Sequence, residues 1–82
     1  MATPTRPQLG APLTDRELEI LEAVSHGHYI ASIAARMFLS ENTVKTHLLR
    51  INIKLGARGK THAVAIAYRR GLLDTYTERT AA

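Results

Sequence analysis

The stretch LSENTVKTHLLRINIKLG, residues 39–56, has the marks of a single helix with a defined start and end. Ser40 is a good N-cap residue, and Gly56 stands where a left-handed residue commonly follows a helix. Between them, apolar residues recur at the i, i+4, i+7, i+11 spacing of one buried helix face: Val44, Leu48, Ile51 and Leu55. The sequence therefore predicts a helix over about 41–55, with one buried face and one outward face of mixed composition.

Two helices are predicted before this one. Thr14, with Glu17 three residues later, forms a capping box at the start of a first helix over about 15–25. The second helix is expected over about 30–37, although no Ser, Thr, Asp or Asn stands before it as a cap. A turn of about three residues then leads into the 41–55 helix, so these two helices form a candidate helix-turn-helix unit.

A fourth helix is predicted over about 60–70, with Gly71 as its C-terminal stop. No strand candidate and no internal repeat is found, so the expected fold class is a small all-α domain of four helices over residues 13–74. Residues 1–12, with three prolines, are expected to form a flexible N-terminal arm. Residues 75–82 are expected to be a frayed C-terminal tail.

Charge is distributed unevenly along the chain. The net charge is +4 over 82 residues, yet the segment 13–25 holds four acids against one arginine, and 36–70 holds eight bases against one acid. Such asymmetry favours a polyanionic partner, nucleic acid before membrane, because no helix pairs a Lys-rich face with a broad aromatic one. A basic surface that is merely solvated is the alternative.

Several classes of protein are excluded by composition. The chain has no cysteine, no signal-peptide pattern and no apolar run near the roughly 18 residues that span a bilayer, so a soluble cytoplasmic protein is expected. His26, His28 and His47 lack a carboxylate or thiolate that would complete a metal site. No nucleophile, base and orienting group stand at usable spacing. We therefore expect neither a metal, nor a cofactor, nor an enzyme.

Four segments together resemble one known family, the LuxR-type helix-turn-helix domain. They are LTDRELEIL at 13–21, IAARMFLSENTVKTHLLRI at 33–51, KLG at 54–56 and AVAIAYRRGLL at 63–73. The resemblance implies four helices, of which the third enters the major groove of DNA and the fourth commonly forms a homodimer contact. Double-stranded DNA is thus the expected partner.

The resemblance also implies roles for individual residues. Lys45 and Thr46 match positions whose side chains usually face bases, and Asn42 matches one that reaches bases in some members. Ser40, Thr43 and Lys54 match positions near the DNA backbone. The chemistry of the side chains adds a base contact at Leu49, where either Leu49 or the Thr46 methyl would suit thymine methyls, and phosphate contacts at Arg50, Arg58 and Lys60.

These roles have simpler alternatives. Lys45 could pair with Glu41 one turn earlier, and Ser40 is fully explained as a helix cap. The chain also departs from the family pattern at five positions, namely Tyr29 and Ile30 for a polar pair, Asn52 for an apolar residue, Ile53 for a small or charged one, and Gly59 for a Ser or Asn cap.

The fourth helix carries more apolar residues than a small core needs. Residues 63–68 are all apolar and surround the helix axis, which leaves one face for a second copy of the chain. The predicted interface of this homodimer, weak in solution, comprises Val64, Ala65, Ile66, Tyr68 and Arg69. The alternative is that alanine is simply a good helix former and Ile66 a lone exposed residue.

The sequence therefore predicts a sequence-specific DNA-binding transcriptional regulator. The alternative is a protein-interaction module of the same fold that binds another regulator or RNA polymerase, for which exposed Leu49 and Ile53 would be suited. Most LuxR-type domains follow a receiver or sensor domain. The chain is thus either a stand-alone regulator or an output domain, and Met1 and the unmatched arm favour the former.

Overall fold

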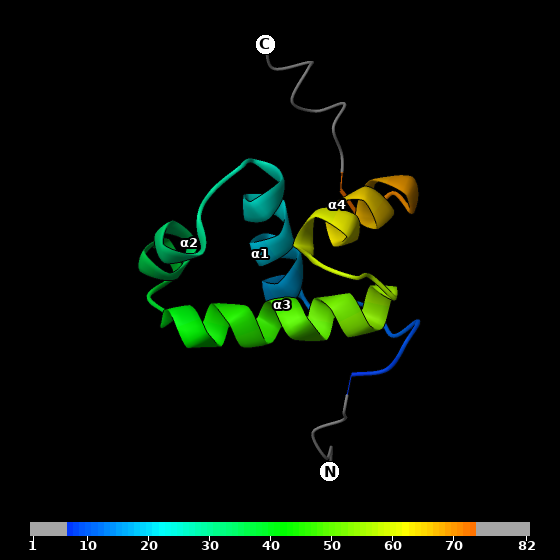
Figure 1. Ribbon diagram of the computed structural model, residues 1–82, viewed down its shortest axis with the longest axis horizontal. Coiled ribbons are helices and arrows are strands. Elements are labelled where there is room, and N and C mark those ends of the chain that lie inside the picture. Colours follow the sequence, from blue (N-terminus) through cyan, green and yellow to red (C-terminus); the bar gives the residue numbers. More distant parts are fainter. Residues whose placement is uncertain (1–6, 74–82) are drawn as a thin grey trace.

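A computed structural model describes residues 7–73 and contains four helices (Figure 1). They are α1 (Asp15–Ser25), α2 (Ile30–Met37), α3 (Glu41–Leu55) and α4 (Lys60–Arg69). Within 7–73 no strand is formed, which confirms the predicted all-α class and the order of the helices. The predicted frayed tail lies outside the described residues. None of the helices in the described part has the length and apolar character required to cross a bilayer.

The helix ends form as the local sequence predicts. The Thr14 hydroxyl accepts a hydrogen bond from the Glu17 amide at 3.1 Å, and the Glu17 carboxylate accepts one from the Thr14 amide at 2.9 Å. This is the predicted capping box at the start of α1. At the start of α3 the Ser40 hydroxyl accepts from the Thr43 amide at 3.0 Å, and Gly56 ends the helix with a φ of +70°. These bonds satisfy amides that the first turn of a helix leaves unpaired.

A single apolar core is shared by all four helices. In Figure 1, α3 runs along one side of the molecule, and α1, α2 and α4 lie on the other side of it. The core residues are Ile20, Leu21, Ile33, Ala34, Val44, Leu48, Ile51, Leu55, Ala63, Ile66, Ala67 and Leu73. The predicted inward stripe of α3 is buried in full, so its opposite face is turned away from the rest of the domain.

Helix α4 shows one clear difference from the sequence-based expectation. Ile66, predicted to lie in a dimer interface, is only 7% exposed and belongs to the core. The buried face of α4 consists of Ala63, Ile66 and Ala67, which follow the i, i+3, i+4 pattern of one helix face. Because two of these three residues are alanines, Ile66 supplies most of the volume with which α4 fills the core.

The N-terminal arm also differs from expectation where it is described. Residues 7–12, which we call the strap, contact the C-terminal end of α3 instead of lying free. The Gly10 amide donates to the carbonyl of Lys54 at 2.8 Å, and the Lys54 ammonium donates to the carbonyl of Pro12 at 3.2 Å. The folded unit therefore includes residues that low hydrophobicity had assigned to the arm. Residues 1–6 lie outside the described part of the chain.

Candidate nucleic-acid interface

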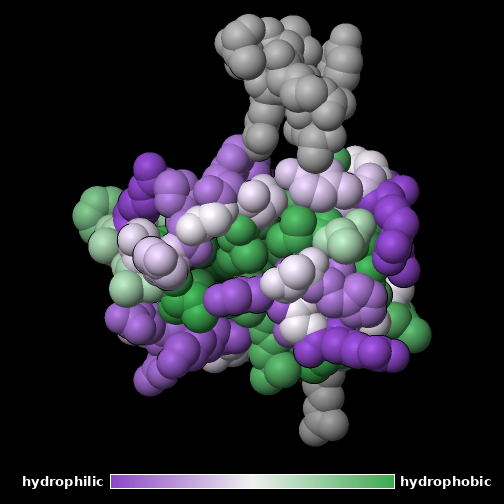
Figure 2. All heavy atoms as spheres, turned by 45° about the horizontal axis from the view of Figure 1, so that its top comes forward, coloured by the Kyte–Doolittle hydropathy of each residue, from purple (hydrophilic) through white to green (hydrophobic). Residues whose placement is uncertain are grey.

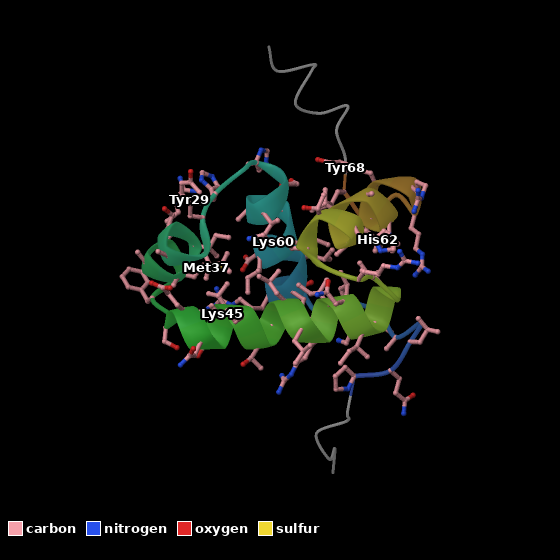
Figure 3. The ribbon with its side chains drawn as sticks, viewed as in Figure 1. Tyr29, Met37, Lys45, Lys60, His62 and Tyr68 are labelled. Carbon is pink, nitrogen blue, oxygen red and sulfur yellow. The ribbon has the colours of Figure 1, made fainter. Side chains whose placement is uncertain are left out.

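The outward face of α3 carries one row of exposed residues directly opposite the buried stripe. At 3.6 residues per turn, Asn42, Thr46, Leu49 and Ile53 fall on the same side of the helix. All four are exposed, and Leu49 and Ile53 expose 59% and 41% of their surface. Figure 3 shows side chains projecting from α3 on the side away from the other helices. This outward row includes all the predicted base contacts except Lys45.

Cations border the outward row on both sides. Lys45 lies on one flank and Arg50 on the other, and both side chains are exposed. Within residues 7–73 neither forms a hydrogen bond or an ion pair, so the alternative pairing of Lys45 with Glu41 is not made. Figure 3 labels Lys45 on the N-terminal half of α3. A helix about 10–12 Å wide suits a major groove about 12 Å wide, and both cations would then face DNA.

The first turn of α3 offers a different kind of contact. The hydroxyls of Ser40 and Thr43 lie 2.9 Å apart, and the Ser40 hydroxyl also accepts from the Thr43 amide. Both residues therefore have a structural role in capping the helix. The remaining amides of the first turn, with the positive end of the helix dipole, favour a phosphate at this end. The predicted phosphate contacts at both residues stay predictions, compatible with their role as caps.

Lys54 occupies a position unlike the one predicted for it. Its ammonium lies 2.7 Å from the Glu17 carboxylate, and the side chains of Lys54 and Glu17 are only 12% and 4% exposed. Burial alone would raise the pKa of Glu17, but hydrogen bonds from Lys54 and from the Thr14 amide, with the positive charge of Lys54 nearby, lower the pKa below its ordinary value. The charge of Lys54 is thus neutralised inside the domain, where it joins the end of α3 to the start of α1.

Sequence reasoning missed the Glu17–Lys54 ion pair, although a weak signal exists. Lys54 follows Ile51 by three residues and therefore lies at the edge of the buried stripe of α3, while Glu17 is the inward-reaching acid of the capping box. A charged residue beside a buried stripe favours an internal partner. Which acid it meets depends on how α1 crosses α3, and that crossing is not encoded in either segment alone.

Two further predicted phosphate contacts lie after α3, Arg58 in the link and Lys60 at the first position of α4. Arg58 and Lys60 are exposed, and their side chains form no hydrogen bond or ion pair within residues 7–73. The Arg58 backbone amide donates to His62 Nδ1 at 3.0 Å, which fixes the link, and Gly59 makes no side-chain cap. Figure 3 shows Lys60 at the start of α4. These two bases and those of α3 give the interface four unpaired cations.

The turn between α2 and α3 contains an unusual residue that sequence reasoning passed over. Phe38 has a φ of +58°, in the left-handed region, and is 95% exposed. A bulky residue there costs roughly 1–2 kcal/mol relative to an ordinary conformation. The turn itself requires this conformation, because the Phe38 and Leu39 amides donate to carbonyls of Ala35 and Ala34 at the end of α2.

Two buried polar atoms lack a hydrogen-bond partner among the described residues. They are His47 Nδ1 and Asn52 Oδ1, both on α3. Asn52 stands where the family pattern expects an apolar residue, and its position beside the core explains why an apolar side chain is usual there. Among residues 7–73, no group of three or more histidines and acids is placed to hold a metal ion.

The outward side of α4 remains available for a partner. Ala65 and Arg69 are exposed, and Val64 and Tyr68 are half-buried, so four of the five predicted dimer residues lie at the surface and Ile66 does not. Figure 2, in which the top of Figure 1 is turned toward the viewer, shows apolar residues across the middle of the visible face between hydrophilic margins. The surface therefore offers apolar area away from α3.

Comparison with known proteins gives a consistent result. The model of the family described as "Bacterial regulatory proteins, luxR family" matches residues 11–67. The Bacillus subtilis transcriptional regulatory protein YxjL is 44% identical over 67 residues, which is 82% of this chain and 31% of that protein. The probable transcriptional regulatory protein NarL of Mycobacterium tuberculosis is 42% identical over 73 residues, which is 89% of this chain and 32% of that protein.

A solved structure is similar as well. The crystal structure of response regulator ChrA, from a heme-sensing two-component system, has 41% sequence identity and a TM-score of 0.74. The match covers 77% of this chain and 31% of that one. The chain thus spans about a third of the length of the proteins that it matches.

Proposed function

The chain belongs to the luxR family of bacterial regulatory proteins and has the family's helix-turn-helix DNA-binding fold, and from this we propose that it regulates transcription by reading specific double-stranded DNA sequences through α3. The observation that carries the proposal is the outward face of α3. It combines hydrogen-bonding, methyl-bearing and cationic side chains, all exposed, opposite a stripe that is fully buried. The base edges of a major groove require that mixture.

The positions of the side chains indicate which residues would contact bases and which would contact the DNA backbone. Asn42, Lys45, Thr46 and Leu49 lie on the outward row or its edge and would face bases. Ser40 and Thr43 at the start of α3, Arg50 on its flank, and Arg58 and Lys60 after it would contact phosphates. Lys54 is left out of this set because its charge is paired with Glu17.

We further infer that two copies bind together through α4. The outward residues Val64, Ala65 and Tyr68 form a small apolar surface beside Arg69. An isologous pair would present two copies of α3 to successive major grooves, one helical turn apart. Because the surface is small, association should be weak in solution and strong on a two-part site, where the first copy raises the effective concentration of the second.

Two measurements test these proposals. Selection from a random duplex pool should recover a preferred sequence. Binding to that sequence should weaken with salt. The three cations assigned to phosphates in each copy predict a slope of log K against log salt of roughly −2.7 per copy, or about twice that for two copies. A flat salt response with no selected sequence would contradict DNA recognition.

The dimer has a test of its own. Ala65→Glu places a charge on the exposed side of α4 without touching the core, so the helical circular dichroism should not change. The doubly bound complex on a two-part site should be lost, while binding to a single half-site should remain. Glu41→Ala, a substitution at an exposed position on α3, serves as a control for surface changes elsewhere. Retention of the doubly bound complex in Ala65→Glu would exclude this face as the contact.

The alternative function, a protein-interaction module that binds another regulator or RNA polymerase, is favoured by one observation, the exposure of Leu49 and Ile53 on the same helix. It predicts no selected duplex sequence and no strong dependence on salt. The same two measurements therefore separate the two functions. In either case we expect the protein to act in the cytoplasm.

A further inference from the structure

The outward row of α3 has an apolar middle that general attraction to DNA does not require. Thr46, Leu49 and Ile53 follow one another at i, i+3 and i+7, and each carries methyl groups to the surface directly opposite the core. We propose that Thr46 and Leu49 recognise the C5-methyl groups of two thymines in each half-site, so that the protein distinguishes thymine from the same base without its methyl. The inference rests on the proposed function and specifies which chemical groups of the DNA are read.

The hydrogen bond made by the Thr46 hydroxyl supports this assignment. Its hydroxyl donates a hydrogen bond to the Asn42 carbonyl at 2.9 Å, within the same helix. The proton of the hydroxyl is therefore already used, and the other substituent on Cβ is a methyl group. A threonine bonded in this way contributes apolar contact more readily than a donated hydrogen bond.

Leu49 lies at the right distance along the helix to contact a second thymine. Three residues of helix rise by about 4.5 Å, close to the roughly 3.4 Å that separates successive bases along one strand. Leu49 exposes 59% of its surface, and no described element covers it. Apolar contact with the thymine methyl is a recognised way in which side chains read bases in the major groove.

Charge indicates that the apolar row meets DNA before another protein. Lys45 and Arg50 border the row on its two flanks, and within residues 7–73 neither is paired with an acid. A protein partner would have to cover both cations with acids of its own. A major groove instead supplies phosphates at its edges, which suit Arg50, and base acceptors and methyl groups on its floor, which suit Lys45 and the row.

Ile53 provides a matched control within the same row. It is exposed by 41%, but it is third from the end of α3 and lies one turn before Gly56, which is near Leu9 of the strap. The N-terminal residues of a recognition helix contact base edges, whereas its C-terminal end leaves the groove. We therefore assign methyl recognition to Thr46 and Leu49 and not to Ile53.

The experiment uses the full chain and the duplex recovered by selection, in which each thymine is replaced in turn by deoxyuridine. This replacement removes one methyl and changes no hydrogen-bonding group. Burial of a methyl-sized group corresponds to about a fourfold change in an equilibrium constant. Binding of the unchanged protein should therefore weaken about fourfold at two positions per half-site and hardly at all at the others.

Substitutions then assign each methyl to its reader. Leu49→Ala should remove the discrimination at one position and leave it at the other. Thr46→Ser, which removes only the methyl, should remove it at the second position, whereas Thr46→Val, which keeps the methyl, should retain it. Ile53→Ala should retain both. All three positions have exposed side chains, and circular dichroism should confirm an unchanged helical content.

Three results would overturn the inference, and they are distinguishable. Selective binding that is insensitive to deoxyuridine at every position would refute methyl recognition and leave the proposed function intact. Loss of discrimination in Ile53→Ala as large as in Leu49→Ala would refute the choice of Leu49. Failure to select any duplex sequence would refute the proposed function itself, and methyl recognition with it.

Discussion

Replacing Glu17 by glutamine should destabilise the domain by about 1.5–3 kcal/mol. The Glu17 carboxylate accepts hydrogen bonds from two donors, and its negative charge neutralises the positive charge of Lys54. It accepts from the Thr14 amide at 2.9 Å and from the Lys54 ammonium at 2.7 Å, and its side chain is 4% exposed. Glutamine keeps the size and one acceptor oxygen but loses the charge. Both bonds reach the same oxygen, Oε1, so an amide oxygen can still accept them, but Lys54 would be left with neutral acceptors only, this oxygen and the Pro12 carbonyl at 3.2 Å.

Glutamine is the informative replacement because alanine would do more than break the pair. Removing one partner of a buried ion pair costs about 3–5 kcal/mol, and loss of the capping box adds roughly 1 kcal/mol. A chain of 82 residues is expected to have a total stability of only about 4–12 kcal/mol. Glu17→Ala is therefore expected to unfold a large fraction of the molecules, whereas Glu17→Gln leaves a measurable folded state.

Urea unfolding followed by circular dichroism would measure the effect. A double-mutant cycle with Lys54→Met isolates the pair, because the double variant Glu17→Gln/Lys54→Met leaves neither charge buried. We expect the two single losses to exceed the loss in the double variant by at least about 1 kcal/mol. Arg16→Met, at a position where the ion pair with Glu19 is exposed, should change stability by less than about 0.5 kcal/mol and serves as the control.

The contribution of Glu17 should depend on pH in a defined direction. Its pKa is lowered in the folded state, so the native protein binds fewer protons than the unfolded chain as acid is added. The stabilisation is therefore present in full above the ordinary value of 4.5 and is lost as the pH falls through the lowered pKa. The difference between the unchanged protein and Glu17→Gln should shrink over that interval and be constant between pH 6 and 8.

DNA binding supplies a second, independent readout. Because the charge of Lys54 is paired inside the domain, Lys54→Met should leave the salt slope of DNA binding unchanged, whereas Arg50→Met should reduce it by about 1. Additive losses in the cycle, with no coupling between Glu17 and Lys54, would refute the account of the buried pair. If Lys54→Met lowered the salt slope, Lys54 would instead contact a DNA phosphate.

Other consequences concern single side chains. Lys45→Ala should lose roughly 1–3 kcal/mol of binding free energy on the selected duplex and little on random duplex, whereas Lys60→Ala should weaken binding to both alike. Equal losses on the two duplexes for Lys45→Ala would mean that Lys45 contacts the DNA backbone. Phe38→Gly should raise the urea midpoint by the equivalent of about 0.5–1 kcal/mol, because glycine accepts a φ of +58° without strain; a lower midpoint would show that the phenyl ring stabilises the turn. Gly56→Ala should lower the free energy of unfolding by roughly 1–2 kcal/mol, because the φ of residue 56 is +70°. The Leu9 side chain lies 3.0 Å from the new methyl, but it is exposed and can move, so it adds little to this cost. No measurable loss would contradict this.

The extents of the helices could be derived from the sequence because local interactions determine them. The first three helices occupy the predicted ranges, and the last ends one residue before its predicted limit. A capping box, a serine cap and a glycine stop each act within four residues of chain. The inward stripe of α3 was equally readable, because its i, i+4, i+7, i+11 spacing admits only one buried face. The outward row followed from the same periodicity.

The partners of individual side chains were decided by the tertiary structure. Residues 63–68 of α4 are apolar on all sides, so periodicity did not select a buried face, and the packing of α4 on α1 and α3 placed Ile66 inside. Glu17 and Lys54 are 37 residues apart, and only the crossing of α1 over α3 brings them within 2.7 Å. The strap was held by bonds to the Lys54 backbone and ammonium, which its own composition does not encode. Local rules describe a residue and its near neighbours in sequence, whereas these contacts depend on the angle and position at which separate helices meet.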